Sequence, residues 1–226
     1  MILVYILVGL LTVLYSCLIA YYAYHWNRIP VSEPTLPLNP QPVSIVIAAR
    51  NEEKHVVSCV QSCLNQNYPP HLLEVIVVDD QSEDDTNDLL EAIEDPRFKL
   101  MRLGVYRRTT IKGSKKKALA YGIHHASGTI ICTTDADCLV PPDWVRHMVS
   151  RFAEPQVRLV SGPVGIHHPE KAIHYFQALD FSANGLINGS GLQSGLHHLC
   201  NGANLAYRKS DFLEQDAFED NYHIAS

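Results

Sequence analysis

Two aspartates one residue apart, Asp135 and Asp137, come directly after an apolar run at residues 128–134. A strand alternates its side chains, so the two carboxylates share a face if the strand persists or if the chain turns tightly there. Hard cations such as Mg²⁺ and Mn²⁺ take oxygen ligands and often share them with phosphates. The spacing therefore indicates a divalent-metal site, and a solvated acidic turn is the alternative interpretation.

The elements that would position these carboxylates alternate along the chain. Apolar, β-branched runs predict strands, and helical spacing predicts the segments between them. Predicted strands are 43–49, 74–79, 98–103, 129–133 and 205–207, and predicted helices are 52–65, 86–93, 115–125 and 169–188. Continuous apolar strands joined by helices favour an α/β fold with a mostly parallel sheet that is covered on both faces.

Three polar clusters fall at the carboxyl ends of the predicted strands: residues 49–52, residues 79–80 and residues 135–137. Open α/β sheets bind ligands beyond the carboxyl ends of their strands. We therefore expect the three clusters to form one site.

Residues 1–24 contain no charged side chain, and as a helix they would span about 36 Å. This predicts a transmembrane helix at residues 1–26. A signal peptide would need a basic first segment and a shorter apolar stretch. Aromatic residues 21, 22, 24 and 26 suit a membrane interface, and Arg28 is the first cation, so the positive-inside rule predicts a single-pass anchor in the cell membrane with the following domain in the cytoplasm.

Five prolines lie within residues 29–42, and they predict an extended linker at 27–42, followed by a globular domain at 43–226. The formal net charge of -6 belongs wholly to the part after residue 27 and argues against a general nucleic-acid binder. The six cysteines show no disulfide-framework spacing, which suits a reducing compartment.

Five motifs occur in an order that resembles the family-two inverting glycosyltransferases with a GT-A fold. They are the segment 43–53 (VSIVIAARNEE), the segment 77–82 (VVDDQS), Lys115, the segment 134–137 (TDAD) and the segment 200–209 (CNGANLAYRK). The resemblance covers roughly residues 42–226. It implies an enzyme of the hexosyltransferase type that moves a sugar from a UDP-sugar, with Mn²⁺ or Mg²⁺ as cofactor, to a glycan or lipid-linked acceptor hydroxyl.

The resemblance also implies roles for individual residues. The donor-binding set is Ala49, Arg50, Asn51, Glu52, Asp79, Asp80, Lys115, Asp135 and Ala136. Within it, Asp80 would accept a hydrogen bond from the base, Asp79 would orient the loop, and Lys115, or Lys116 or Lys117 in another register, would lie near the nucleotide. Asp137 would hold the metal that bridges the diphosphate, and Asp135 would face the ribose or the metal. Asn201, Gly202 and Asn204 would line the acceptor side.

The family's catalytic base is an aspartate in an acidic pair, and the resemblance implies that it lies beyond Ser226. We therefore expect the chain to be a C-terminally truncated fragment without its base, also because the family's Gln-x-x-Arg-Trp motif is not in the sequence. Loss of a base removes roughly 10² to 10⁴-fold in rate. Glu219 and Asp220 form an acidic pair near the end and are the alternative candidates.

Two other functions fit parts of the sequence. A non-catalytic, membrane-tethered module that binds nucleotide sugars or acts as a scaffold would show the same motifs. A nucleotidyltransferase would need a glycine-rich phosphate loop after the first strand, and residues 49–52 contain no glycine.

A basic patch and a long helix remain unassigned. Seven cations lie within residues 102–117, and a solvated face, anionic lipids and nucleotide phosphates are competing explanations. The predicted helix at 169–188 would pack on the domain, lie along the membrane or line the acceptor groove.

Overall fold

The computed structural model describes residues 1–30, 39–103, 114–167, 169–197 and 199–214. Its helices are α1 (Ile2–Trp26), α2 (Val56–Leu64), α3 (Thr86–Glu91), α4 (Lys115–His125), α5 (Trp144–Ser150), α6 (Ala172–Ser194) and α7 (Lys209–Glu214), with 3₁₀ turns η1 (Pro70–Leu72) and η2 (Arg151–Ala153). Its strands are β1 (Val43–Ala49), β2 (Leu73–Asp79), β3 (Phe98–Arg102), β4 (Ile130–Asp135), β5 (Leu159–Ser161) and β6 (Leu205–Arg208).

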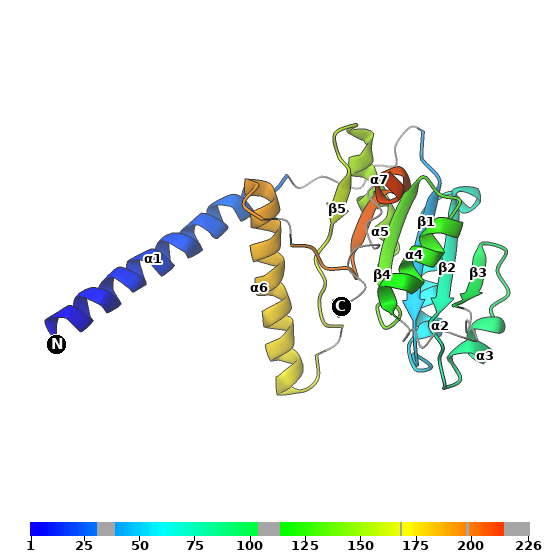
Figure 1. The fold of residues 1–226 in the computed structure, drawn as a ribbon, viewed down its shortest axis with the longest axis horizontal. Helices are drawn as coiled ribbons and strands as arrows, with labels where there is room; N and C mark the ends of the chain where they lie inside the picture. The colour runs from blue at the N-terminus through cyan, green and yellow to red at the C-terminus, as the bar shows by residue number, and fades with distance from the viewer. Residues whose placement is uncertain (31–38, 104–113, 168, 198, 215–226) are drawn as a thin grey trace. The chain divides into compact units, whose positions relative to one another are not determined.

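The chain forms two compact units (Figure 1). One unit combines residues 1–32 with residues 162–201, and it contains α1 and α6. The other combines residues 33–161 with residues 202–226 and contains the sheet. The excursion 162–201 thus separates β5 from β6 along the chain.

The sheet has six strands in the order β3-β2-β1-β4-β6-β5. The first four strands are parallel, while β6 runs antiparallel to both β4 and β5. A mostly parallel α/β sheet is therefore confirmed. The two antiparallel pairs at β6 make it a mixed sheet.

Side-chain alternation along β1 divides the core into two layers. Ile45 and Ile47 point to the layer that contains α2 and α5, and Val46 points to the layer that contains α4. Helix α4 lies very close to the sheet at Gly122, where a Cβ atom would stand 2.6 Å from Val46 Cγ1. Both faces of β1 and β2 are thus almost fully buried, which explains why these two strands are mostly apolar.

A polar cluster crosses the sheet away from its carboxyl edge. Glu74 on β2 is paired with Lys99 on β3 at 2.6 Å, and it accepts a hydrogen bond from Ser44 on β1. The backbone N–H of Gly128 in turn donates to the Ser44 hydroxyl at 2.8 Å. Three adjacent strand segments are therefore held in register by one buried carboxylate.

Helix α1 is, within the described ranges, the one helix long and apolar enough to cross a membrane, with a mean hydropathy of 2.6. None of its residues is buried. A signal sequence near an N-terminus can pass the same test of length and hydropathy, so the anchor predicted at residues 1–26 remains a proposal.

Candidate active site

The sheet register brings the three predicted polar clusters to one edge. Ala49, the last residue of β1, pairs with Asp79, the last residue of β2. On the other side of β1, Ala48 pairs with Asp135, the last residue of β4. Because the three strands are parallel, their carboxyl ends form a single edge that carries Asp79, Asp80 and Asp135.

The loops after β1 and β2 are hydrogen-bonded to each other. Asp80 N donates to the carbonyl oxygen of Ala49 at 2.8 Å, and Asn51 N donates to Ser82 Oγ at 3.0 Å. In return, Glu83 N donates to Asn51 Oδ1 at 2.8 Å. Ala49 itself is buried, so its carbonyl group rather than its methyl group is available to the loop.

Each of these loops contains a residue with a left-handed backbone. Asn51 has φ 55° and Gln81 has φ 62°, values that residues other than glycine rarely adopt. Such backbone strain clusters at ligand sites, where the surrounding contacts hold it in place. Gln81 directly follows Asp80, and Asn51 is hydrogen-bonded to Ser82 in the same loop.

Further contacts fix the second half of this double loop. Glu52 N donates to Thr86 Oγ1 at 2.8 Å, and Glu53 N donates to Asp84 Oδ2 at 3.2 Å. Thr86 N also donates to Asp84 Oδ1 at 3.1 Å. Sequence reasoning missed the roles of Ser82, Asp84 and Thr86. Their pattern of short polar residues before a helix was the available signal.

Asp79 is hydrogen-bonded to the loop that follows it and to α3. Its side chain is buried, and it accepts hydrogen bonds from Ser82 N at 3.2 Å and from Asn87 Nδ2 at 3.0 Å. Asn87 Oδ1 accepts one from Arg102 Nε at 3.1 Å, and Arg102 is ion-paired with Glu91. This line of contacts ties the loop to α3 and to the end of β3.

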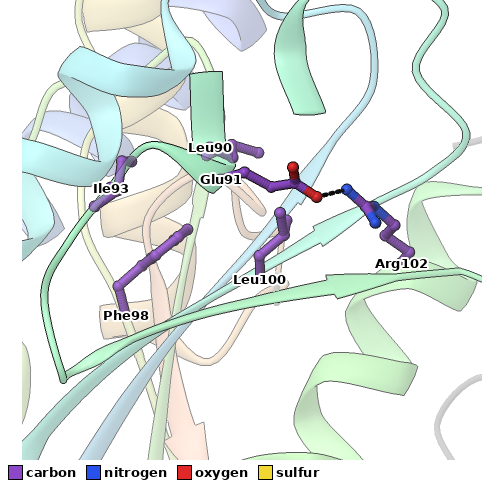
Figure 2. Close-up of a pocket in the computed structure, with 6 residues that line it drawn as sticks. All are labelled: Leu90, Glu91, Ile93, Phe98, Leu100 and Arg102. Atoms are coloured by element: carbon purple, nitrogen blue, oxygen red, sulfur yellow. Dashed lines mark hydrogen bonds and ion pairs between the residues drawn. The ribbon is translucent and has the colours of Figure 1, made fainter. Parts of the chain in front are cut away.

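A cavity of about 500 Å³ lies between α3 and β3 (Figure 2). Its lining residues are Leu90, Glu91, Ile93, Phe98, Leu100 and Arg102. The Glu91–Arg102 ion pair spans one side of it. None of the predicted donor-binding residues lines this cavity.

The carboxylate of Asp80 is buried but incompletely hydrogen-bonded. The residue is 4% exposed, and its Oδ1 atom has no hydrogen-bond partner within the part of the chain that the structure describes. Burial raises the pKa of Asp80, with Asp79 adding to the shift and Arg50 and Lys117 opposing it. Buried polar atoms in folded proteins are nearly always hydrogen-bonded. The arrangement therefore presents an acceptor that suits a ligand N–H or O–H group.

Asp135 lies beside a cation at the same edge. Lys115 Nζ, at the start of α4, is 2.6 Å from Asp135 Oδ1, and both side chains are partly exposed. The chain turns tightly after β4, because Cys138 N donates to the carbonyl oxygen of Asp135 at 3.1 Å. Cys59 Sγ, on α2, donates to that same oxygen at 3.3 Å.

Several carboxylates share this corner of the domain. Burial raises the pKa of Glu52, and the charges of Asp137, Asp84 and Asp135 raise it further, against His55. No group of three or more His, Cys, Asp or Glu side chains suited to a metal is found among residues that the structure describes.

The predicted acceptor-side residues have structural contacts. The carbonyl oxygen of Gly202 accepts a hydrogen bond from Thr133 Oγ1 at 2.9 Å, and Asn204 Oδ1 accepts one from Trp144 Nε1 at 2.8 Å. Asn201 ends the excursion 162–201 and belongs to the unit that contains α6. The weak base candidates Glu219 and Asp220 lie outside the described residues.

Comparison with known families decides what kind of domain carries this edge. The model of a family described as glycosyl transferase family 2 matches residues 44–214, which include both loops described above and all of the strands except the first residue of β1. The chain belongs to glycosyl transferase family 2. The resemblance seen in the sequence motifs is thereby confirmed, and the site described above is a site of a family 2 domain.

Curated relatives match parts of this family 2 domain. The chain is 35% identical over 115 residues to the beta-monoglucosyldiacylglycerol synthase of Synechocystis sp., covering 50% of this chain and 23% of that protein. It is 30% identical over 138 residues to glycosyltransferase AglE of Haloferax volcanii, covering 60% and 42%. The matched segments thus span less than half of these relatives.

Solved structures share the fold. The mannosyltransferase PcManGT from Pyrobaculum calidifontis, in complex with GDP-Man and Mn²⁺, aligns with a TM-score of 0.66 and 23% identity, covering 92% of this chain and 56% of that one. TarS 1-349 of S. aureus with UDP-GlcNAc aligns with a TM-score of 0.56 and 19% identity, covering 77% and 47%. These structures support the GT-A fold expected from the sequence.

Proposed function

We propose that this family 2 glycosyltransferase moves a sugar from a metal-bound UDP-sugar to an acceptor hydroxyl, with inversion at the anomeric carbon. The observation that carries the proposal is the buried carboxylate of Asp80, whose Oδ1 lacks a hydrogen-bond partner in the described part of the chain. It lies at the same strand edge as the Lys115–Asp135 pair. One edge of the sheet thus offers a hydrogen-bond acceptor for the nucleobase and charged groups for the diphosphate.

Each cluster has a part in the proposed donor site. The double loop made by residues 49–53 and 80–86 holds the nucleoside, with Asp80 accepting a hydrogen bond from the imide N–H of uracil. Asp79 positions that loop through Ser82 and Asn87. Lys115 lies next to Asp135 and attracts the phosphates, because an ammonium group is a compact phosphate-binding charge.

The residues at this corner fit a divalent cation. Asp135 and Asp137 supply carboxylate oxygens, and the raised pKa of Glu52 reflects burial and the negative charge gathered there. A bound Mg²⁺ or Mn²⁺ would act as a Lewis acid and stabilise the charge on the departing nucleoside diphosphate. The complex of PcManGT with GDP-Man and Mn²⁺ supports a divalent metal in a protein of the same fold.

The proposed reaction is a single displacement. The acceptor hydroxyl oxygen forms a bond to the anomeric carbon as the bond from that carbon to the diphosphate oxygen breaks, and the hydroxyl proton passes to a carboxylate base. The described residues leave that base unassigned. The acceptor is a glycan or a lipid-linked molecule, a range supported by the diacylglycerol named in one group of relatives.

The same proposal places the domain at the membrane, with α1 as a single-pass anchor and the sheet on the cytoplasmic side. Support comes from the length and hydropathy of α1 and from Arg28, which follows it and stacks over the ring of Tyr24 at 4.2 Å. Cations that flank a span favour the cytoplasmic side.

Calorimetric titration of UDP into the detergent-solubilised chain, with and without Mn²⁺, tests the donor site. We expect Mn²⁺-dependent binding that falls at least about tenfold in Asp137→Asn, because one metal ligand is lost. Glu94→Gln, which removes an exposed carboxylate from the loop after α3, is the matched control and should bind as the unmodified chain does.

GDP titrated in parallel separates the nucleotide classes. Tighter binding of GDP than of UDP would overturn the choice of uracil while leaving the metal-dependent diphosphate site in place. A folded chain that binds neither nucleotide would overturn the whole donor-site assignment and favour a scaffold function.

A further inference from the structure

Helix α6 exposes large apolar side chains over its N-terminal half. Leu179 is 69% exposed, Phe176 67% and Ile173 56%. These values resemble those of α1, in which Leu7 is 54% exposed and Ile6 62%. Exposing side chains of this size to water forgoes about 25 cal/mol for each square ångström that could be buried.

Part of the exposed apolar surface of α6 follows one face. Ile173 and Tyr175, which is 60% exposed, flank that face on its two sides, and Asp180 lies about 40° around the helix from Phe176. An α-helix turns 100° per residue, so Phe176, Leu179, Ala183 and Ile187 lie within one stripe, and Ser190 continues it towards the C-terminal end. We call this set the α6 stripe. Gln177 lies outside the stripe, about 100° around the helix from Phe176.

The C-terminal end of the α6 stripe meets α1. Ser190 is fully buried, and its hydroxyl donates to the backbone carbonyl oxygen of Tyr22 at 2.8 Å. The neighbouring Gly189 lies so close to Trp26 that a Cβ atom would stand 3.0 Å from its ring. The stripe is therefore continuous with a packed contact onto the aromatic end of α1.

This contact sets the depth at which α6 lies if α1 spans a bilayer. Tyr and Trp residues at the end of a span settle at the membrane–water interface. The end of α6 that touches Tyr22 and Trp26 is then held at the membrane–water interface, and the exposed part of the α6 stripe would extend along that interface. Asp180 and His174 interrupt the helix with polar groups, which suits a helix in the interfacial plane and not one across the bilayer.

We propose that α6 is a second membrane-contacting element, lying in the lipid headgroup region with the α6 stripe buried among the upper acyl chains. The inference rests on the proposed anchoring by α1 and adds to it an interaction surface for lipid. One consequence is that α1 and α6 form a single lipid-bound unit, consistent with their grouping in one compact unit.

Tryptophan quenching by lipid tests the proposal in the full chain. The chain has two tryptophans, and Trp26→Phe leaves only Trp144, which is buried beside Asn204 in the other unit. Three further single changes are made in that background: Phe176→Trp in the stripe, Gln177→Trp outside it, and Leu10→Trp within α1. Each variant is reconstituted into phosphatidylcholine vesicles with acyl chains brominated near the glycerol backbone.

We expect Phe176→Trp to be quenched at least about twofold more than Gln177→Trp, because only the first ring reaches the acyl chains. Quenching of Leu10→Trp without quenching of Phe176→Trp would overturn the α6 proposal while leaving the anchor intact. No quenching at Leu10→Trp would show instead that the anchor itself is wrong. Dimers that protect Phe176→Trp from bromine would assign the stripe to a second copy of the chain and so overturn the lipid proposal.

Discussion

At the scale of single residues, the buried carboxylate of Asp80 should lower the free energy of unfolding while it strengthens the proposed binding of UDP. Its carboxylate is buried with one oxygen lacking a partner in the described part of the chain, so Asp80→Asn should keep or raise the free energy of unfolding, by up to about 1 kcal/mol. The same change should weaken UDP binding about tenfold, since an amide presents a donor as well as an acceptor. Urea unfolding and calorimetry measure the two effects.

The pH dependence of that variant follows from the direction of the shift. Burial raises the pKa of Asp80 in the folded chain, so the folded state binds the proton more readily than the unfolded state does. The unmodified chain should therefore lose stability relative to Asp80→Asn as pH rises from the unfolded-state pKa through the folded-state value. A difference that stays constant with pH would contradict this account of the carboxylate.

Lys115 gives a second prediction at this scale. Its ammonium group occupies one oxygen of Asp135, and because both side chains are partly exposed the pair contributes only about 0–1 kcal/mol to folding. Lys115→Met should therefore bind Mn²⁺ more tightly in the absence of nucleotide, and bind UDP more weakly, by about threefold or more in each case. Equal losses in both titrations would mean that Lys115 supports the loop instead of competing for the carboxylate.

At the scale of elements, Glu74 joins three strands and makes their pairing sensitive to acid. Burial alone would raise its pKa, but hydrogen bonds from Lys99, Ser44 and Ser127 outweigh burial and lower the pKa to about 2. The stabilisation is thus present above the unfolded-state value and is lost as pH falls towards 2, amounting to up to about 3 kcal/mol.

Urea unfolding between pH 7 and pH 2, in the unmodified chain and in Glu74→Gln, measures this predicted loss of stability. The variant should be less stable near neutral pH and should lose less stability on acidification, so that the two curves converge. Glu94→Gln controls for the removal of one negative charge. Parallel curves for Glu74→Gln and the unmodified chain would show that another group governs the acid response.

At this scale, several strands and helices could be predicted from the sequence, and several could not. Strand β1 and helix α4 have the predicted bounds, because a mostly apolar run rich in β-branched residues and a segment with helical spacing have strong local signals. Strand β4 runs two residues further than predicted and includes Asp135. Helix α5, strand β5 and helix α7 were not predicted, since each is short and depends on packing against the sheet.

The shared edge of Asp79, Asp80 and Asp135, which is the proposed donor edge, could be placed from the sequence because parallel strands end at the same edge of a sheet. The contacts of Asn87, Arg102 and Glu91 could not, because they depend on the register of β3 against β2, which no local pattern encodes. The pairing of Ser190 with Tyr22 was equally hidden, since the two residues are 168 positions apart.

At the scale of the whole molecule, helix α1 should stabilise the fold of α6. Deleting residues 1–26 removes the surface against which Ser190 and Gly189 pack. We expect faster hydrogen exchange across α6 in the shortened chain and unchanged protection in β1 and β2, because the sheet belongs to the other compact unit. Mass spectrometry of deuterated peptides measures both regions in one experiment. Unchanged protection of α6 would show that its fold does not need α1.

The excursion at residues 162–201 leaves the sheet and returns to it at one point, because Ser161 on β5 pairs with Leu205 on β6. Closing a loop depends only weakly on its length, each doubling adding roughly 0.6 kcal/mol. A longer, shorter or different segment in this place would therefore be compatible with the same strand order, so the part of the chain that carries α6 can change independently of the proposed nucleotide edge.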